Sequence, residues 1–133
     1  MSEYIKPLPK PSPTSRPFWE AARRHELQLQ QCESCRKFIY YPRDRCPDCF
    51  SDRLAWRQVS GRGKVHSYTV VRRASARSFG DGPYVLAIVE LDEGPRMTTN
   101  IVALPEQVRV EMPVVVHFDD VTPEHTLVKF KPA

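Results

Sequence analysis

The sequence predicts a mainly β protein, in which a short N-terminal helix and a small cysteine-based metal module precede a five-stranded barrel of the OB type. Thirteen prolines among 133 residues disfavour long helices, because proline lacks a backbone N–H and clashes in a helix interior. The four cysteines all lie between residues 32 and 49. The last half of the chain holds five short apolar segments separated by turn signals, which fit a small barrel better than a sandwich of about seven strands.

Composition and charge exclude several classes of protein. Hydrophobic residues make up 41% of the chain, too many for a wholly disordered protein, and no run of eighteen apolar residues could span a membrane. The N-terminus, MSEYIKPLPKPSPTSRP, has no apolar stretch typical of a secretory signal, so a cytoplasmic location is expected. Residues 16–77 carry fourteen bases and six acids, whereas residues 78–133 carry four bases and nine acids. This asymmetry hints at a basic face for a polyanion, although charge runs are usually solvated surface.

The N-terminal region is predicted to contain an extended arm and one helix. In residues 1–14, proline recurs at alternate positions, which favours a polyproline-like arm that either stays free or docks on a partner as a strap. Residues 15–26 are predicted to form the helix, with Ser15 as its N-cap and Pro17 in its first turn. Its apolar stripe is expected to hold Phe18, Ala21, Ala22 and His25. Trp19 lies off that stripe, where it either covers a neighbouring module or forms an exposed contact.

The remainder of the chain is predicted to be β structure. Segments 27–31 and 54–60 are expected to be strands that flank the cysteines, so residues 27–60 form one metal module. A turn at residues 61–64 begins the barrel, which extends over residues 61–133. Residues 103–112 are read as a connector with one helical turn. The five barrel strands are expected at residues 65–73, 84–91, 97–102, 114–118 and 126–130.

The cysteines form the pattern C-x2-C-x10-C-x2-C, with Cys32, Cys35, Cys46 and Cys49 as the candidate ligands. A two-residue gap lets both thiolates of a knuckle reach one ion, and two knuckles supply the four-sulfur shell that structural zinc favours. Disulfides would need an oxidising compartment, and a redox pair would explain only half of the pattern. A four-sulfur iron site has the same ligands. Catalytic zinc is disfavoured, because it keeps an open position and usually draws on histidine or carboxylate ligands.

Other chemistry is sparse. The four histidines are scattered, and no G-x-S-x-G, P-loop or G-x-G-x-x-G motif is present, so the isolated chain is expected to catalyse no reaction. Arg72, Arg73 and Arg77 surround the loop after the first barrel strand, where OB barrels commonly bind ligands. Their guanidinium groups suit phosphates, although a solvated loop explains them equally well.

The order of these motifs resembles a known family. PFWEAARRHELQLQQCESC, VSGRGKVHSYTVVRR and YVLAIVELDEG follow one another as in the zinc-ribbon and OB-fold proteins called domain of unknown function 35. The resemblance covers residues 15–132 and implies a rubredoxin-like zinc ribbon with the four cysteines as ligands. Ribbons often carry glycine after each knuckle; here Arg36 and Phe50 stand there, so local backbone strain is expected.

The resemblance also implies a function. Members of that family accompany thiolase-superfamily enzymes as non-catalytic partners in acyl-CoA condensation, acyl transfer or retro-aldol cleavage, including degradation of sterol side chains. An accessory subunit of a hetero-oligomer is therefore expected, with Arg72, Arg73 and Arg77 as candidate contacts to the phosphates of a shared CoA thioester. The alternative is a module that binds single-stranded nucleic acid. Tyr68, Phe79 and Tyr84 offer no obvious stacking platform for it, and the acidic C-terminal half argues against it.

Overall fold

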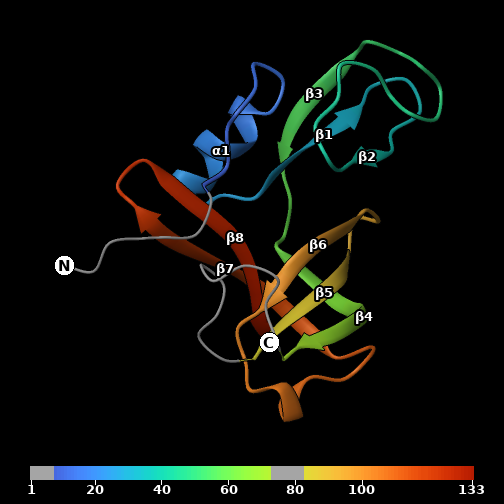
Figure 1. Cartoon of the computed structure of the whole chain (residues 1–133). Coiled ribbons are helices and arrows are strands. Elements are labelled where there is room, and N and C mark those ends of the chain that lie inside the picture. The colour runs from blue at the N-terminus through green and yellow to red at the C-terminus, as the bar shows by residue number, and fades with distance from the viewer. Residues whose placement is uncertain (1–7, 73–82) are drawn as a thin grey trace.

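The computed structural model describes residues 8–72 and 83–133, which form a helix, a small ribbon and a barrel (Figure 1). The N-terminal part holds α1 (Arg16–Arg23), β1 (Gln28–Cys32), β2 (Phe38–Ile39) and β3 (Leu54–Gln58). The barrel holds β4 (Arg62–Val71), β5 (Tyr84–Leu91), β6 (Arg96–Ile101), η2 (Pro105–Gln107), β7 (Pro113–Thr122) and β8 (His125–Pro132). Within these residues, no helix has the length and apolar character needed to cross a membrane.

Helix α1 is short and buries one face. Phe18, Ala21 and Ala22 are buried, as the predicted stripe requires. Ser15 stands at the N-cap position, but its side chain makes no capping bond to the helix; its hydroxyl instead accepts a hydrogen bond from the Ser12 N–H at 2.9 Å.

The prediction that His25 continues the apolar stripe is wrong. The helix ends at Arg23, and His25 adopts a left-handed backbone (φ 61°) with an exposed side chain. The N–H of Glu26 bonds back to the carbonyl of Ala21 at 2.9 Å, which closes the helix in a Schellman-type turn. His25 therefore occupies the position where glycine is the usual residue.

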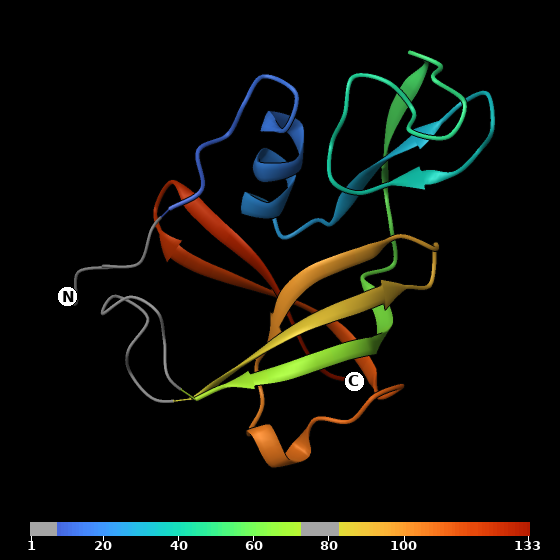
Figure 2. The same cartoon turned by 45° about the vertical axis from the view of Figure 1, so that its right-hand side comes forward.

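The ribbon is a three-stranded antiparallel sheet in the order β2-β1-β3. Gln30, in the central strand, lies opposite Ile39 on one side and Trp56 on the other. Both views show the ribbon projecting away from the barrel, joined to it by the chain between β3 and β4 (Figures 1 and 2). The predicted strands at 27–31 and 54–60 are thus confirmed, while β2 is an element that the sequence did not indicate.

The barrel confirms the predicted five strands, which close in the order β4-β5-β6-β8-β7. Closure between β6 and β8 rests on one parallel pair, Ile101 opposite Phe130. Strand β5 matches its predicted limits at residues 84–91, and the connector contains the expected helical turn, η2. The predicted turn at residues 61–64 is wrong in part, because β4 already begins at Arg62 and only Gly61 lies outside the strand, with a left-handed backbone (φ 76°).

One apolar core joins the helix, the base of the ribbon and the barrel. Phe18, Leu27 and Leu29 belong to the same cluster as the inward residues of the barrel, Phe130 among them. Trp19 is half-buried against this cluster: it lies edge-on to Phe18 (5.1 Å, 88°), and its indole N–H donates to the Tyr41 hydroxyl at 3.2 Å. Trp19 thus has the intramolecular covering role that the sequence left open.

Candidate metal centre

The two cysteine knuckles are built alike. In the first, the N–H of Arg36 bonds the carbonyl of Cys32 at 2.8 Å; in the second, the N–H of Phe50 bonds the carbonyl of Cys46 at 2.9 Å. Arg36 and Phe50 both have a positive φ, 70° and 62°. The expected strain at these two positions is therefore confirmed, since neither residue is a glycine.

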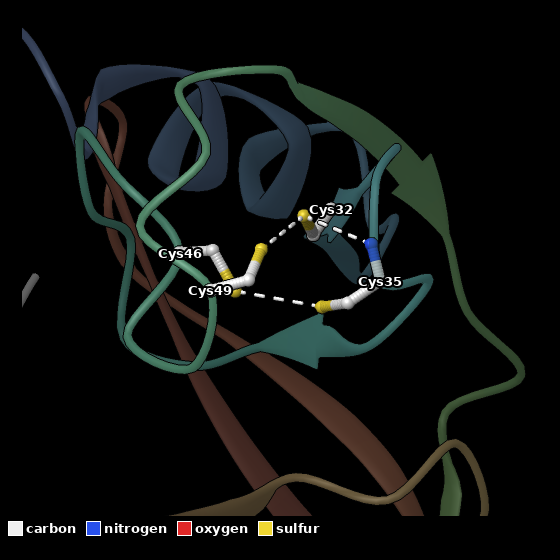
Figure 3. Close-up of side chains that lie close together, drawn as sticks. All are labelled: Cys32, Cys35, Cys46 and Cys49. Atoms are coloured by element: carbon white, nitrogen blue, oxygen red, sulfur yellow. Dashed lines mark hydrogen bonds between the residues drawn. The ribbon is translucent and has the colours of Figure 1, made fainter.

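The four sulfur atoms converge between the knuckles (Figure 3). All lie within 4.8 Å of one another, with Cys32 Sγ 3.5 Å from Cys49 Sγ and Cys35 Sγ 3.6 Å from Cys46 Sγ. A tetrahedral ion with sulfur ligands at about 2.3 Å needs sulfur atoms about 3.8 Å apart. The side chains that the spacing predicted as ligands are thus placed to share one ion.

The backbone prepares the first cysteine of each knuckle to lose its proton. The N–H of Cys35 points at Cys32 Sγ (3.4 Å), and this hydrogen bond is the largest of the effects that lower the pKa of Cys32 to about 6. In the second knuckle, the N–H of Cys49 lowers the pKa of Cys46 in the same way. Metals bind the thiolate, so N–H groups directed at sulfur favour the metal-binding form.

The pKa of the second cysteine of each knuckle is instead raised when the four side chains are free thiols. The Ser51 N–H lowers the pKa of Cys49, but neighbouring thiols and desolvation outweigh it and raise that pKa to about 12. Four thiols packed this closely cannot all lose their protons without a cation between them. The donor set therefore fits a divalent metal.

The ribbon has little apolar core of its own beyond these cysteines. Its separate cluster contains Cys32, Cys46 and Ile39 as buried residues, with Cys35 and Leu54 packed against them. Such a module is too small to be stable by hydrophobic burial alone, and a bound metal would supply the missing cross-link.

Polar bonds tie the knuckles and their loop together. Lys37 pairs with Asp48 at 2.9 Å across the two knuckles, and the Ser34 hydroxyl donates to that of Ser51 at 3.0 Å. The pair also raises the pKa of Lys37, chiefly through its hydrogen bond to Asp48. These cross-links hold the knuckles in register around the four sulfur atoms.

Of the three arginines predicted to bind phosphate, the structure describes one, Arg72. Arg72 is exposed just beyond β4 and lines a surface groove with Tyr68, Val70, Pro83, Leu104, Pro105 and Glu106. Arg73 and Arg77 lie outside the described residues, as does Phe79.

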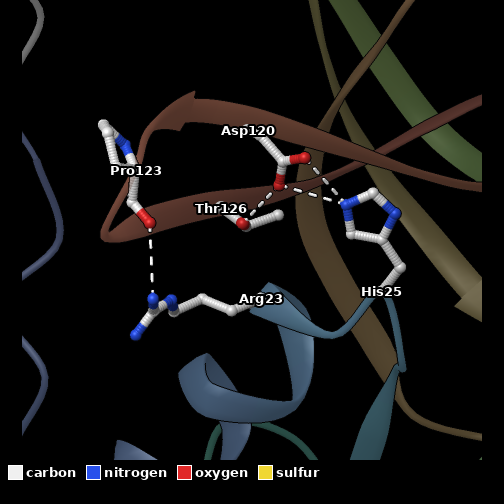
Figure 4. Close-up of polar contacts among 5 residues, drawn as sticks. All are labelled: Arg23, His25, Asp120, Pro123 and Thr126. Carbon is white, nitrogen blue, oxygen red and sulfur yellow. Dashed lines mark hydrogen bonds and ion pairs between the residues drawn. The ribbon is translucent and has the colours of Figure 1, made fainter.

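A further polar contact joins α1 to the hairpin of β7 and β8 (Figure 4). His25 Nε2 lies 2.9 Å from a carboxylate oxygen of Asp120, which also accepts a 2.6 Å hydrogen bond from Thr126 through its other oxygen. Arg23 donates to the carbonyl of Pro123 at 3.4 Å. No local sequence pattern indicates this contact, because 95 residues separate His25 from Asp120.

A rubredoxin-like ribbon followed by an OB barrel defines a class of two-module proteins, and comparison with known proteins gives the family. Residues 19–55 match the family model "ChsH2, rubredoxin-like zinc ribbon domain", and residues 56–119 match "ChsH2, C-terminal OB-fold domain". A DUF35 domain-containing scaffold protein of Methanothermobacter thermautotrophicus is 36% identical over 90 residues, which cover 67% of this chain and 68% of that protein. The chain belongs to the DUF35 family of zinc-ribbon and OB-fold proteins.

Two further relatives are informative. The chain is 39% identical over 118 residues to a probable enoyl-CoA hydratase alpha subunit of Thermomonospora curvata; the match covers 87% of this chain but only 37% of that subunit. A solved structure described as "Ltp2-ChsH2(DUF35) aldolase" contains a chain that is 35% identical, with a TM-score of 0.83 and coverage of 93% of this chain and 98% of that one. A DUF35 protein of Sulfolobus solfataricus, 15% identical with a TM-score of 0.68 over 91% of this chain and 86% of that one, shares the fold.

Proposed function

We propose that this chain is a non-catalytic accessory subunit of a thiolase-like enzyme that acts on acyl-CoA substrates, in condensation, acyl transfer or retro-aldol cleavage. The observation that carries the proposal is the likeness, over nearly the whole of both chains, to the DUF35 chain of the Ltp2-ChsH2 aldolase. The scaffold proteins among its relatives support the same role. Degradation of a sterol side chain is one pathway of this chemical class.

In this proposal, Cys32, Cys35, Cys46 and Cys49 hold a structural zinc. Their convergence supports this, as does the match of residues 19–55 to a zinc ribbon. When bound, zinc with four thiolates has no open position for a substrate, so its contribution is to the fold. The cysteines must stay reduced to bind it, which fits a cytoplasmic location.

The surface of the barrel supports a partner. The outward row of β5 holds Tyr84, Leu86 and Ile88, and Leu86 is 39% exposed. Because its inward residues are apolar too, β5 is apolar on both faces over most of its length, more than a lone barrel needs. In a subunit, such a row adds to the apolar contact area that a stable complex requires.

The proposal extends to the CoA thioester. Arg72, together with Arg73 and Arg77, would contact its phosphates at the site shared with the catalytic subunit. The groove beside Arg72 supports this arrangement, because it offers apolar walls next to a guanidinium group.

The test is purification of the tagged full-length chain from its own host, followed by reconstitution from separately produced subunits. We expect a thiolase-superfamily subunit to co-elute in a fixed ratio on size-exclusion chromatography, and acyl-CoA turnover to depend on that subunit. Separate elution at micromolar concentrations would contradict the proposal. Tight binding of a single-stranded oligonucleotide, with an affinity that falls steeply as salt is added, would then favour the alternative function, binding of single-stranded nucleic acid.

A further inference from the structure

Four residues other than glycine adopt a left-handed backbone in the described chain: His25, Arg36, Phe50 and Glu111. This conformation costs free energy for any residue with a Cβ atom, and it is a pronounced outlier for a bulky side chain. Glycine avoids this cost, and a residue with a side chain at such a position can offset it through the contacts that its side chain makes.

Two of the four have that contact within the chain. His25 stacks on Phe118 (5.2 Å between centroids, 8° between planes) and reaches Asp120. Glu111 forms an ion pair with Lys64 at 3.0 Å. In both cases the side chain thus makes a contact with the barrel.

Phe50 has no comparable contact. The residue is 71% exposed, the largest exposed fraction among the exposed large apolar residues that the structure describes. Within residues 8–72 and 83–133, its ring belongs to neither apolar cluster and to none of the aromatic pairs. Phe50 thus combines a left-handed backbone with an exposed aromatic side chain.

Two arginines lie on the same pair of knuckles as Phe50. Arg45 donates to the carbonyl of Phe50 at 3.2 Å, and Arg36 occupies the equivalent position of the other knuckle, which the Ser34–Ser51 hydrogen bond holds alongside. Both arginines are exposed, and neither forms an ion pair within the described residues. We call Phe50, Arg36 and Arg45 the knuckle tip. It lies on the ribbon, which projects away from the barrel (Figures 1 and 2).

We propose that the knuckle tip is a docking element, whose phenyl ring enters an apolar pocket rimmed by carboxylates on the thiolase-like subunit. The inference rests on the proposed function and names the surface through which it operates. An exposed aromatic residue together with two exposed arginines on the same ribbon has the composition of an interface hot spot, and the two cations set the complementary charge on the partner. A protein pocket is favoured over a single strand of nucleic acid, which binds to several stacked aromatic residues along a basic groove.

The test compares full-length variants in their binding to the purified thiolase-like subunit by titration calorimetry. Phe50→Gly should raise the Kd at least tenfold, while zinc content stays the same and the thermal midpoint stays equal or rises, because glycine relieves the strain. The matched control is Val110→Ala, which truncates another exposed apolar side chain (54%) in the barrel loop before β7; its Kd should stay within twofold. Arg36→Gln should weaken the dependence of Kd on salt.

A second readout does not depend on affinity. Replacement of Phe50 by photoreactive p-benzoylphenylalanine should give a covalent adduct with the catalytic subunit, in a peptide that contains Asp or Glu. An unchanged Kd for Phe50→Gly, or the absence of an adduct in a complex that forms normally, would overturn the inference but leave the proposed function intact. Failure of the wild-type chain to bind the catalytic subunit would overturn both. Loss of oligo-dT binding in Phe50→Gly, with the Kd for the subunit unchanged, would assign the tip to nucleic acid.

Discussion

His25 and Asp120 join the end of the helix to the barrel through one imidazole and one carboxylate. Nε2 of His25 lies 2.9 and 3.1 Å from the two carboxylate oxygens, and its ring stacks on Phe118 of the same strand as Asp120. The strained backbone of His25 is thus the cost of a contact between residues far apart in the sequence. This contact fixes α1, and with it the start of the ribbon, against the β7–β8 hairpin.

The first prediction concerns this contact and pH. A hydrogen bond from Thr126 and the neighbouring His25 hold the pKa of Asp120 below its usual range. The carboxylate therefore stabilises the fold above its unfolded pKa of about 3.9, and this contribution is lost as the pH falls through the lower folded pKa. Asp120→Asn should lower the free energy of unfolding more at pH 6 than at pH 2.5, measured by urea denaturation. Asp92→Asn, an exposed carboxylate, is the matched control; an equal deficit of Asp120→Asn at both pH values would contradict the prediction.

The second prediction concerns a buried amide in the ribbon. Gln30, which is 6% exposed, donates from Nε2 to the carbonyl of Arg43 and accepts from the N–H of Arg43, both at 2.8 Å. Gln30→Ala would leave both backbone groups without this partner, at a cost of about 1–3 kcal/mol in the free energy of unfolding. Gln31→Ala, which removes one bond to the carbonyl of Arg36, should cost less. We call the two Gln30–Arg43 hydrogen bonds the Gln30 clamp. Equal stability of the two variants by chemical denaturation with zinc present would be evidence against a stabilising role of this clamp.

The third prediction concerns the metal. X-ray absorption of the zinc-loaded chain should give four sulfur neighbours at about 2.3 Å. Cys46→Ser should lose the metal and the order of the ribbon, because binding energy at structural sites is folding energy, roughly 10–16 kcal/mol in zinc peptides. Elemental analysis and amide NMR check both effects. Retention of one equivalent of zinc by Cys46→Ser, or purification of the wild type without metal in the absence of chelator, would refute this assignment.

Sequence predicted the regular features of this fold well, for identifiable physical reasons. β5 was predicted to the residue, because an apolar run between glycine- and proline-rich turns has clear ends. The family and its fold followed from the two cysteine knuckles and the order of the motifs, and the strain at Arg36 and Phe50 followed from the usual glycines at those places. These signals are local, so a single sequence carries them.

Features that depend on distant contacts could not be predicted in this way. His25 has the spacing of the helical stripe, but it lies beyond the end of the helix. Its side chain contacts Asp120, which is 95 residues away, and stacks on Phe118. The turn expected at residues 61–64 ends early because Gly63 is paired with both β5 and β7. The Gln30 clamp depends on a loop that returns to β1 only after thirteen residues, so no local pattern indicates it.

The fourth prediction concerns the arginines near the barrel groove. Replacement of Arg72, Arg73 and Arg77 by alanine should raise the KM of the reconstituted complex for acyl-CoA, with a smaller effect on kcat, if their phosphate contacts are equal in the ground and transition states. A pantetheine thioester, which lacks the nucleotide phosphates, should show no difference between wild type and variant. Unchanged kinetics with acyl-CoA would remove these residues from the site.

The last prediction concerns the close approach of β4 to β5. A Cβ atom at Gly63 would lie 2.5 Å from the carbonyl oxygen of Glu90 and 3.0 Å from Val89 Cγ1, and the backbone on that side is fixed by pairing of Gly63 with Leu91. The strand cannot move away, because Gly63 is also paired with Val114 of β7. Gly63→Ala should therefore lower the free energy of unfolding by about 1–3 kcal/mol, the usual cost of overpacking. Thr98→Ala, on the exposed face of β6, should change it by less than about 0.5 kcal/mol. Thermal denaturation followed by far-UV circular dichroism distinguishes the two, and a Gly63→Ala variant as stable as Thr98→Ala would show that the barrel can relax at this junction.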